Sequence, residues 1–301
     1  MDAIRTPLGE PVTNSPGVSY GSRLGAAYAA LHPHRVGRMV LDSVVGPWSR
    51  YAFDAVQSRA LLRQRDLCFA WTAAHADRFG PGGGPAGVRA AGLRVRRGVA
   101  ARPVEGFGAA EFDRAVYRAL GRTERWAGLA DGLRACPREG TVAGLRPASP
   151  FGSASSRNCE AANRVVTCAD GPGPTPGRVL ADLRRTRRID PRPVLTGLEA
   201  SARAYWRYRP ARRTPLGGPG APPLLLVASA HGPLTPAAGA RELRRVLPGS
   251  RLVTLENDYA HGVFASRGNA CVDGTVAAYL VGGAVPAADV RCAGPGLPRV
   301  S

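Results

Sequence analysis

The sequence predicts an α/β fold in which a parallel sheet presents a serine at the end of one strand. The segment Gly17-Val18-Ser19-Tyr20-Gly21 has the G-x-S-x-G pattern of a serine on a sharp turn between a strand and a helix. A helix-like segment follows at 22–31, and residues 39–45 then read as a short buried strand. The unbroken apolar run 222–227 is typical of a buried parallel strand, and residues 252–255 read as the last clear strand.

The serine turn lies inside one strand–helix–strand unit. Residues 11–16 precede it and are weak strand material, because Pro16 has no N–H to donate to a neighbouring strand. The small residues of 22–31 let a helix pack closely against a sheet, and the proline-containing segment 32–36 ends this helix. A strand, a sharp turn, a helix and a second strand make the βαβ unit that the serine pattern requires.

The middle of the chain has helical patterns rather than strand patterns. Residues 54–75 and 107–133 carry apolar side chains at helical spacing. Residues 81–105 consist largely of Gly, Ala, Arg and Pro with little periodicity, which predicts a mobile loop. These patterns divide the chain into a strand-containing part at 1–48, a helical part at 49–215 and a second strand-containing part at 216–301.

These motifs resemble a known family. The turn at 17–21, followed by 31–36 and 39–42, is similar to segments of the secreted tripeptidyl aminopeptidases of actinomycetes and of their prolyl aminopeptidase relatives. The stretch Val166-Thr167-Cys168-Ala169-Asp170-Gly171 resembles their V-T-C-N-D-G motif, and residues 269–292 resemble their C-terminal segment. The resemblance implies an α/β-hydrolase fold, with a partial, doubly wound parallel sheet that lacks the N-terminal strands and with a large helical cap insertion.

The resemblance also implies a function. A serine hydrolase of this type releases short peptides or single residues from free N-termini through an acyl-enzyme, here on Ser19. The expected partner is therefore a peptide substrate with a free N-terminus. The chain contains no match to the family's H-G-G-P-G loop, which supplies a second oxyanion donor, so impaired activity is expected. The alternative is a catalytically inactive, degenerate hydrolase-like protein or a gene fragment.

Three residues are assigned to acyl transfer. Ser19 is the predicted nucleophile, and the backbone N–H of the next residue, Tyr20, is the predicted oxyanion donor. His261 lies just past the last clear strand and follows the serine in the chain order of an α/β-hydrolase triad, so it is the predicted general base. His231 is the rival for that role.

The acid of the triad is the position at which this sequence departs from the family. Comparison with the D-P-x-T-P motif places Gly232 where an aspartate is expected. Losing the orienting acid costs on the order of 10⁴ in turnover, because the base is left in the wrong tautomer. Two substitutes are open: Asp42, at the end of the strand after the serine turn, and Asp258, shortly before His261.

The resemblance gives further assignments outside the triad. Two carboxylates of the cap region, Glu160 and Asp170, are candidates for holding the ammonium group of the substrate. Cys271 and Cys292 are expected to form a disulfide. None of the six cysteines forms a C-x-x-C pair, so no metal site is predicted, and no cofactor is expected.

The composition bounds the partners and the location. The net charge is +19, and all 41 basic residues are arginines. Arg, Ala, Gly and Pro share GC-rich codons, and no nucleic-acid-binding motif accompanies the scattered arginines, so no nucleic acid partner is expected. No apolar run approaches the length of a transmembrane helix, so no membrane partner is expected either. Met1 is not followed by a signal-peptide pattern, and the resemblance implies an extracellular protein if the true start lies upstream.

Overall fold

The protein consists of two compact units. A computed structural model describes residues 1–80, 82–146, 153–171, 173–189, 202–208, 214–218 and 220–300. The core unit comprises Met1–Gln57, Asp170–Gly173 and Tyr208–Leu297, and the helical unit comprises Ser58–Ala169, Pro174–Arg207 and Pro298–Ser301. The units change after Gln57 and Arg207, among other positions, whereas the domain boundaries predicted from the sequence are 48/49 and 215/216.

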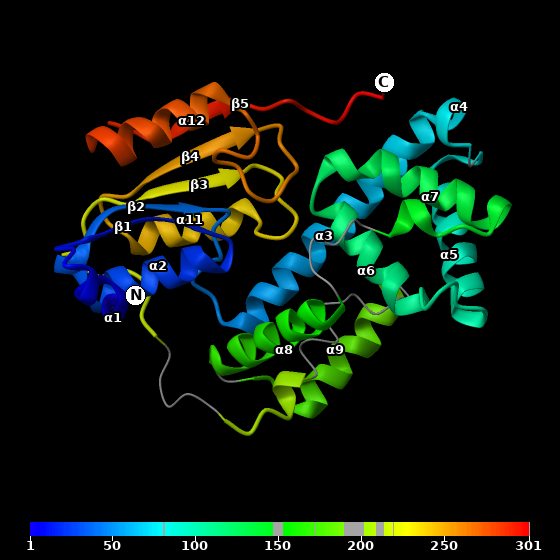
Figure 1. The fold of residues 1–301 in the computed structure, drawn as a ribbon, viewed down its shortest axis with the longest axis horizontal. Helices are drawn as coiled ribbons and strands as arrows, with labels where there is room; N and C mark the ends of the chain where they lie inside the picture. Colours follow the sequence, from blue (N-terminus) through cyan, green and yellow to red (C-terminus); the bar gives the residue numbers. More distant parts are fainter. Residues whose placement is uncertain are drawn as a thin grey trace. The chain divides into compact units, whose positions relative to one another are not determined.

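A parallel sheet forms the centre of the core unit (Figure 1). Its described strands are β1 (Thr13–Val18), β2 (Val36–Asp42), β3 (Leu225–Ser229), β4 (Arg251–Glu256) and β5 (Val290–Ala293). They lie in the order β1-β2-β3-β4-β5, and every neighbouring pair is parallel. The carboxyl ends of all the strands therefore meet at one edge, which is where open α/β sheets bind their ligands. The predicted partial α/β-hydrolase fold is confirmed.

Helices cover both faces of this sheet, as in a doubly wound fold. Helices α2 (Tyr20–Leu31) and α11 (Ala237–Val246) pack on one face in a shared apolar cluster. Helix α12 (Ala270–Ala277) packs on the other face (Figure 1), where Val272 and Val276 are fully buried against β3 and β4. The short helical segments of this unit are α1 (Asp2–Arg5), η1 (Thr6–Leu8), η2 (Pro33–Arg35) and η5 (Ala278–Gly282).

Strand β1 forms although it contains Pro16. In the register of the sheet, Pro16 lies opposite Val40, and the pairing is irregular between Thr13 and Ser15. Among the described strands β1 is at an edge of the sheet, and a proline is tolerated in an edge strand because one side of the strand makes no ladder bonds. The weak strand propensity is thus overridden by the position of the segment.

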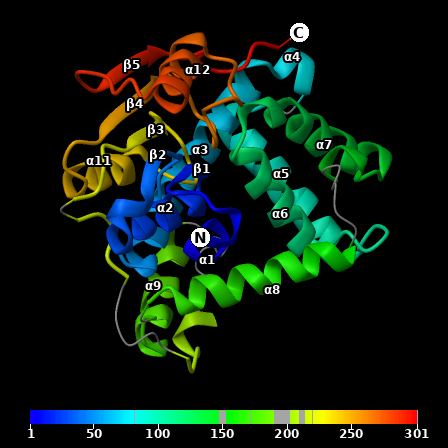
Figure 2. The same ribbon diagram turned by 60° about the vertical axis from the view of Figure 1, so that its left-hand side comes forward.

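The helical unit contains the remaining described helices. Within it, α5, α6 and α7 pack against one another (Figure 2). The element bounds are α3 (Arg50–Ala74, whose first turns belong to the core unit), α4 (Ala76–Phe79), α5 (Gly84–Ala101), α6 (Ala109–Leu120), η3 (Thr123–Arg125), α7 (Trp126–Glu139), η4 (Ala143–Leu145), α8 (Ser153–Ala169) and α9 (Pro176–Ile189).

Helix α5 contradicts the prediction of a mobile loop at 81–105. Its buried residues recur with each turn along one face: Val88, Ala91 with Gly92, Val95 and Val99. This stripe packs against α6 and α7, so tertiary burial stabilises a helix that its own Gly-rich composition does not favour.

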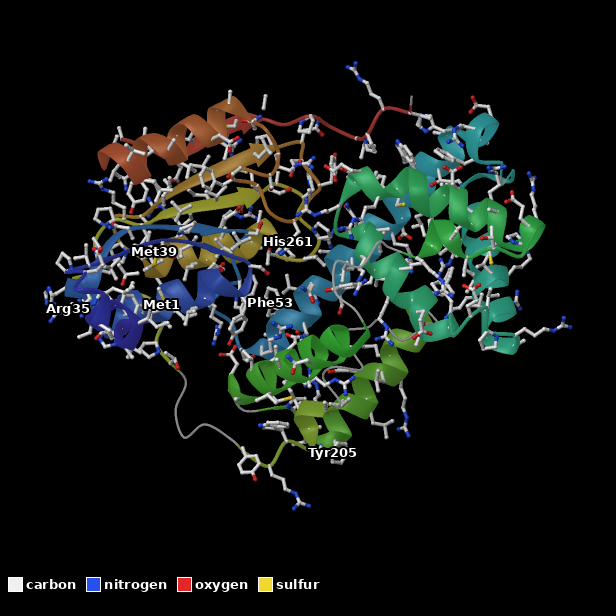
Figure 3. All side chains as sticks on the ribbon, viewed as in Figure 1. Met1, Arg35, Met39, Phe53, Tyr205 and His261 are labelled. Atoms are coloured by element: carbon white, nitrogen blue, oxygen red, sulfur yellow. A yellow bond between two sulfur atoms is a disulfide. The ribbon has the colours of Figure 1, made fainter. Side chains whose placement is uncertain are left out.

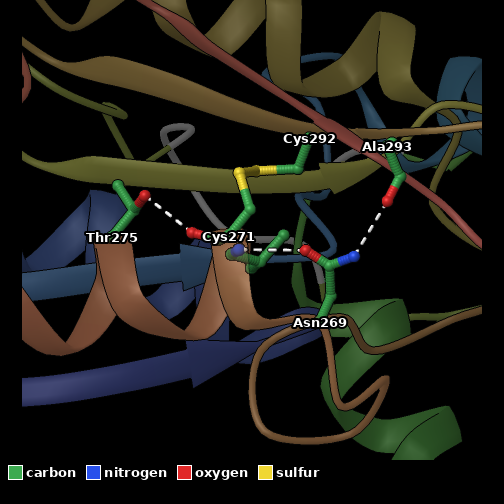
Figure 4. Close-up of a disulfide and its surroundings, with 6 residues drawn as sticks. Asn269, Cys271, Thr275, Cys292 and Ala293 are labelled. Atoms are coloured by element: carbon green, nitrogen blue, oxygen red, sulfur yellow. Dashed lines mark hydrogen bonds between the residues drawn. A yellow bond between two sulfur atoms is a disulfide. The ribbon is translucent and has the colours of Figure 1, made fainter.

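Strand β5 was missed by the sequence prediction, which ended the sheet at β4. It is short, and of its residues only Cys292 is buried. A disulfide joins Cys292 to Cys271 at the first turn of α12, which is the pair expected from the sequence (Figure 4). Asn269 caps α12 by accepting a hydrogen bond from the Val272 N–H, and its amide donates to the Ala293 carbonyl (Figure 4). The covalent bond and the amide therefore tie the last strand to the helix.

Removal of this disulfide is expected to destabilise the core unit. The bond closes a loop of 21 residues, and the double variant Cys271→Ser/Cys292→Ser should lose about 3 kcal/mol of unfolding free energy. Chemical denaturation with and without reductant measures this loss, and reductant should have no further effect on the double variant. Cys136→Ser, in the helical unit, is the matched control. Equal midpoints for the double variant and the oxidised wild type would contradict the expectation.

Candidate active site

Ser19 lies at the turn between β1 and α2, in a backbone conformation that residues other than glycine rarely adopt. Its backbone has φ 59° and ψ −121°. A Cβ on Gly17 would lie 2.6 Å from the Gly21 carbonyl oxygen, so the turn requires glycine at position 17. The Ser19 N–H donates to the Asp42 carbonyl at 2.9 Å, which fixes the turn to the end of β2. A half-buried serine held in this strained geometry is the arrangement of a nucleophile elbow.

Tyr20 places its backbone N–H at the start of a helix. It is the first residue of α2, and N–H groups in the first turn of a helix have no intrahelical acceptor. The positive end of the helix dipole adds to this potential for stabilising an oxyanion. The geometry therefore suits the predicted role of the Tyr20 amide.

His261 lies on the loop between β4 and α12, at the carboxyl edge of the sheet (Figure 3). The parallel topology brings this loop to the same edge as Ser19, which follows β1, and Asp42, which ends β2. The imidazole is half-buried, and its Nδ1 lies 3.1 Å from the Thr235 Oγ1. Residues at the end of three different strands, or shortly after them, thus lie at one edge of the sheet.

Asp42 contacts the loop that carries His261. Its Oδ2 accepts hydrogen bonds from the Val263 N–H at 2.9 Å and from the Phe264 N–H at 3.0 Å. Its Oδ1 accepts one from the Ser43 hydroxyl, whose oxygen in turn accepts from the Gly262 N–H at 2.8 Å. Asp42 is 1% exposed, and this burial raises the pKa of its carboxyl. The observed partners of the Asp42 carboxylate are therefore the N–H groups of Val263 and Phe264 and the Ser43 hydroxyl.

Gly232 occupies the turn after β3 and is buried. A Cβ built on it would lie 3.2 Å from the Ala260 carbonyl oxygen and 3.4 Å from the Thr235 carbonyl oxygen. Ala260 precedes His261 in the chain, and Thr235 contacts the His261 ring. A side chain at position 232 would thus begin next to the backbone of Ala260, which precedes His261, and of Thr235, which contacts its ring.

The two other residues weighed from the sequence have other partners. Asp258 is fully buried and forms an ion pair with Arg267, with 3.0 Å between Oδ1 and the guanidinium. Its Oδ2 accepts from the Ala260 N–H at 3.3 Å, so this carboxylate organises the loop before His261. The imidazole of His231 stacks on the Tyr259 ring at 4.8 Å between centroids.

Asp170 belongs to the core unit and pairs with the elbow helix. Its carboxylate lies 2.8 Å from the Arg23 guanidinium, and both side chains are largely buried. Burial, followed by the nearby Asp170 charge, raises the pKa of the Tyr20 phenol. The three side chains line part of a cavity of about 310 Å³ beside α2. Glu160 lies in α8, and its side chain is outside the described residues.

Thr235 and Ser43 were not singled out from the sequence. Thr235 was visible only as one letter of the motif that contains Gly232, and Ser43 only as the residue after Asp42. Nothing in a single sequence shows that their hydroxyls reach the loop of His261, because that contact depends on how four loops fold over the sheet edge.

The described part of the chain contains neither a metal-binding cluster of side chains nor a membrane-spanning helix. Within it, no three side chains of His, Cys, Asp or Glu gather in a way that could hold a metal ion. None of its helices has both the length and the apolar character needed to cross a membrane.

Known proteins resemble this chain over most of its length. Residues 199–292 match a family described as TAP-like protein. A tripeptidyl aminopeptidase of Streptomyces coelicolor is 35% identical over 99% of this chain and 57% of its own length. That of Streptomyces lividans is 35% identical over 99% of this chain and 58% of its own length. The serine protease Hip1 of Mycobacterium tuberculosis is 29% identical over 97% of this chain and 60% of its own length.

The chain thus spans less than two thirds of the length of these curated relatives. The shared segment nevertheless includes the serine turn, the sheet edge and the C-terminal disulfide. Together with the parallel sheet and the elbow geometry, the comparisons show that the chain belongs to the tripeptidyl-aminopeptidase-like family of α/β-hydrolases.

Proposed function

We propose that the protein is a serine hydrolase that acts on peptides with a free N-terminus, with turnover reduced by the glycine at position 232. The backbone of Ser19 carries this proposal, because a non-glycine residue at φ 59° on a strand–helix turn exposes a hydroxyl at the sheet edge. The substrate class rests on the relatives, of which two are named tripeptidyl aminopeptidases and one a serine protease.

The proposed reaction is acyl transfer through Ser19. His261 Nε2 takes the proton from the Ser19 hydroxyl as its oxygen attacks the scissile carbonyl. The Tyr20 N–H stabilises the oxyanion of the tetrahedral intermediate. The protonated His261 then gives its proton to the leaving amine, and water hydrolyses the acyl-enzyme by the same steps.

The electrostatics of the site explain why turnover would be low. A carboxylate beside the base stabilises the imidazolium that forms in the transition state and fixes its tautomer, and it is worth about 10⁴ in turnover. Gly232 supplies no carboxylate. The Asp42 carboxylate accepts from two backbone amides and from the Ser43 hydroxyl, and the Asp258 carboxylate pairs with Arg267. A protein that has lost activity altogether is the second candidate, and Gly232 favours it.

Recognition of the substrate N-terminus would require an anionic group. Glu160 and Asp170 remain our candidates, although the carboxylate of Asp170 already neutralises Arg23. The Cys271–Cys292 disulfide supports a proposed setting outside reducing compartments.

Peptide anilides with a free N-terminus test this function, with N-acetylated versions as a second substrate set. The wild type should release anilide slowly, Ser19→Ala should release it at the rate of the blank, and acetylation should suppress cleavage. Ser266→Ala, an exposed serine on the loop before α12, is the matched control and should match the wild type. Wild-type release at the blank rate would favour the inactive alternative.

A further inference from the structure

We propose that Thr235 takes the structural place of the missing acid as a positioning residue for His261, and that its hydroxyl aligns the imidazole without fixing its tautomer. This inference rests on the proposed function for its catalytic meaning. The observation behind it is the contact of 3.1 Å between the Thr235 Oγ1 and the His261 Nδ1.

The loop that carries Thr235 is held firmly. Thr235 lies between β3 and α11, is 5% exposed, and precedes Pro236 at the cap of α11. A residue before proline has a restricted backbone. The Gln57 side-chain amide donates to the Leu234 carbonyl at 2.6 Å, which anchors the neighbouring peptide. The hydroxyl therefore occupies a defined position beside the imidazole.

The chemistry of a hydroxyl differs from that of a carboxylate at this position. A base that receives the serine proton on Nε2 must carry its own hydrogen on Nδ1. An ionised carboxylate can only accept, so it selects the tautomer with hydrogen on Nδ1. The Thr235 hydroxyl can accept from Nδ1–H or donate to a bare Nδ1, so it permits both tautomers. In the second tautomer Nε2 carries the hydrogen, and His261 cannot act as the base.

Nitrogen NMR of the histidine rings tests this directly, with His261→Gln used to assign the signals. When the His261 ring of the wild type is neutral, both of its nitrogens should have chemical shifts intermediate between those of protonated and bare nitrogen. Such shifts report two tautomers. In Gly232→Asp, the shifts should move toward a single form with hydrogen on Nδ1. A wild-type ring that is already entirely in that form would overturn the proposal.

The rate at which a fluorophosphonate modifies Ser19 gives the second readout. Thr235→Val removes the hydroxyl at constant shape and should slow modification by about 3- to 10-fold, as expected for one neutral hydrogen bond. Thr235→Ser should restore the rate to within about twofold of the wild type. In the Gly232→Asp background, Thr235→Val should have a smaller effect, because the carboxylate replaces the hydroxyl as the partner of Nδ1.

Thr72→Val is the matched control, because it also removes a buried threonine hydroxyl. The Thr72 hydroxyl donates to a helix carbonyl within the helical unit. It should leave both readouts unchanged. Unchanged ring shifts together with an unchanged modification rate in Thr235→Val would overturn the proposal. If Ser19 is not modified in any variant, the proposed function fails, whereas the ring shifts still decide the role of Thr235. If Thr235→Val does not fold, the wild-type and Thr235→Ser spectra decide it.

Discussion

Gly232→Asp is expected to raise the rate of peptide hydrolysis by about 10- to 1,000-fold. An optimised triad acid contributes about 10⁴ in turnover, and a new carboxylate in an unadapted site should reach only part of that value. The backbone of Gly232 lies outside the left-handed region, so a side chain there is not strained by its φ. The nearest obstacle is the Ala260 carbonyl oxygen, which must move by a few tenths of an ångström.

Two matched variants isolate the charge of the new side chain. Gly232→Asn has nearly the same shape without the charge, and Gly232→Ala adds only the Cβ. Steady-state hydrolysis of a free-N-terminal peptide anilide should rank the variants with Asp well above Asn, and Asn close to the wild type. Equal rates for the Asp and Asn variants would contradict the electrostatic explanation. A folded Asp variant with wild-type turnover would mean that Ser19 and His261 are not assembled for catalysis.

Asp42→Ala is expected to lower the unfolding free energy of the core unit by about 3–5 kcal/mol. The substitution leaves the Val263 and Phe264 N–H groups and the Ser43 hydroxyl without their acceptor, and each buried donor so deprived costs about 1–3 kcal/mol. The substitution also removes the desolvation penalty of the buried carboxylate, which offsets part of this cost. Hydrogen exchange at the Val263 and Phe264 amides measures the local effect, and both should lose protection. The loosened loop should also slow the modification of Ser19.

Asp42→Asn separates hydrogen bonding from charge. It retains one acceptor oxygen, so amide protection should fall less than in the alanine variant. Because burial raises the pKa of Asp42 above its ordinary value of 3.8, the native state binds this proton more tightly than the unfolded state does. Stability should therefore fall as pH rises from 3.8 through the native pKa, and this component should be absent in the Asn variant. Native-like amide protection in Asp42→Ala would contradict the assigned role.

The parts of the fold that local chemistry determines could be predicted from the sequence. The glycines of the serine turn, the small residues of α2 and the apolar runs of β3 and β4 each specify one element without reference to the rest of the chain. Helix α5 could not be predicted from composition, because its narrow stripe of buried valines is diluted by glycine and arginine. Strand β5 could not be predicted because it is short and has one buried residue.

The same distinction applies to the site. Ser19, Tyr20 and His261 were predicted because each follows a recognisable turn or strand, and the structure brings the strand ends to one edge. The loop contacts of Asp42 and the contact of Thr235 with His261 depend on the path of residues 257–269, which carry no regular pattern. The sequence therefore indicated which groups could react, and the structure indicates how their loops are held.

If Ser19 is an activated nucleophile, a fluorophosphonate should modify it covalently. Mass spectrometry of the modified protein and of its peptides would locate the adduct. We predict one equivalent on Ser19 in the folded wild type, none on that peptide in Ser19→Ala, and a much slower reaction in His261→Ala. Folded wild-type protein that leaves Ser19 unmodified, under conditions in which a known serine hydrolase reacts completely, would contradict the claim.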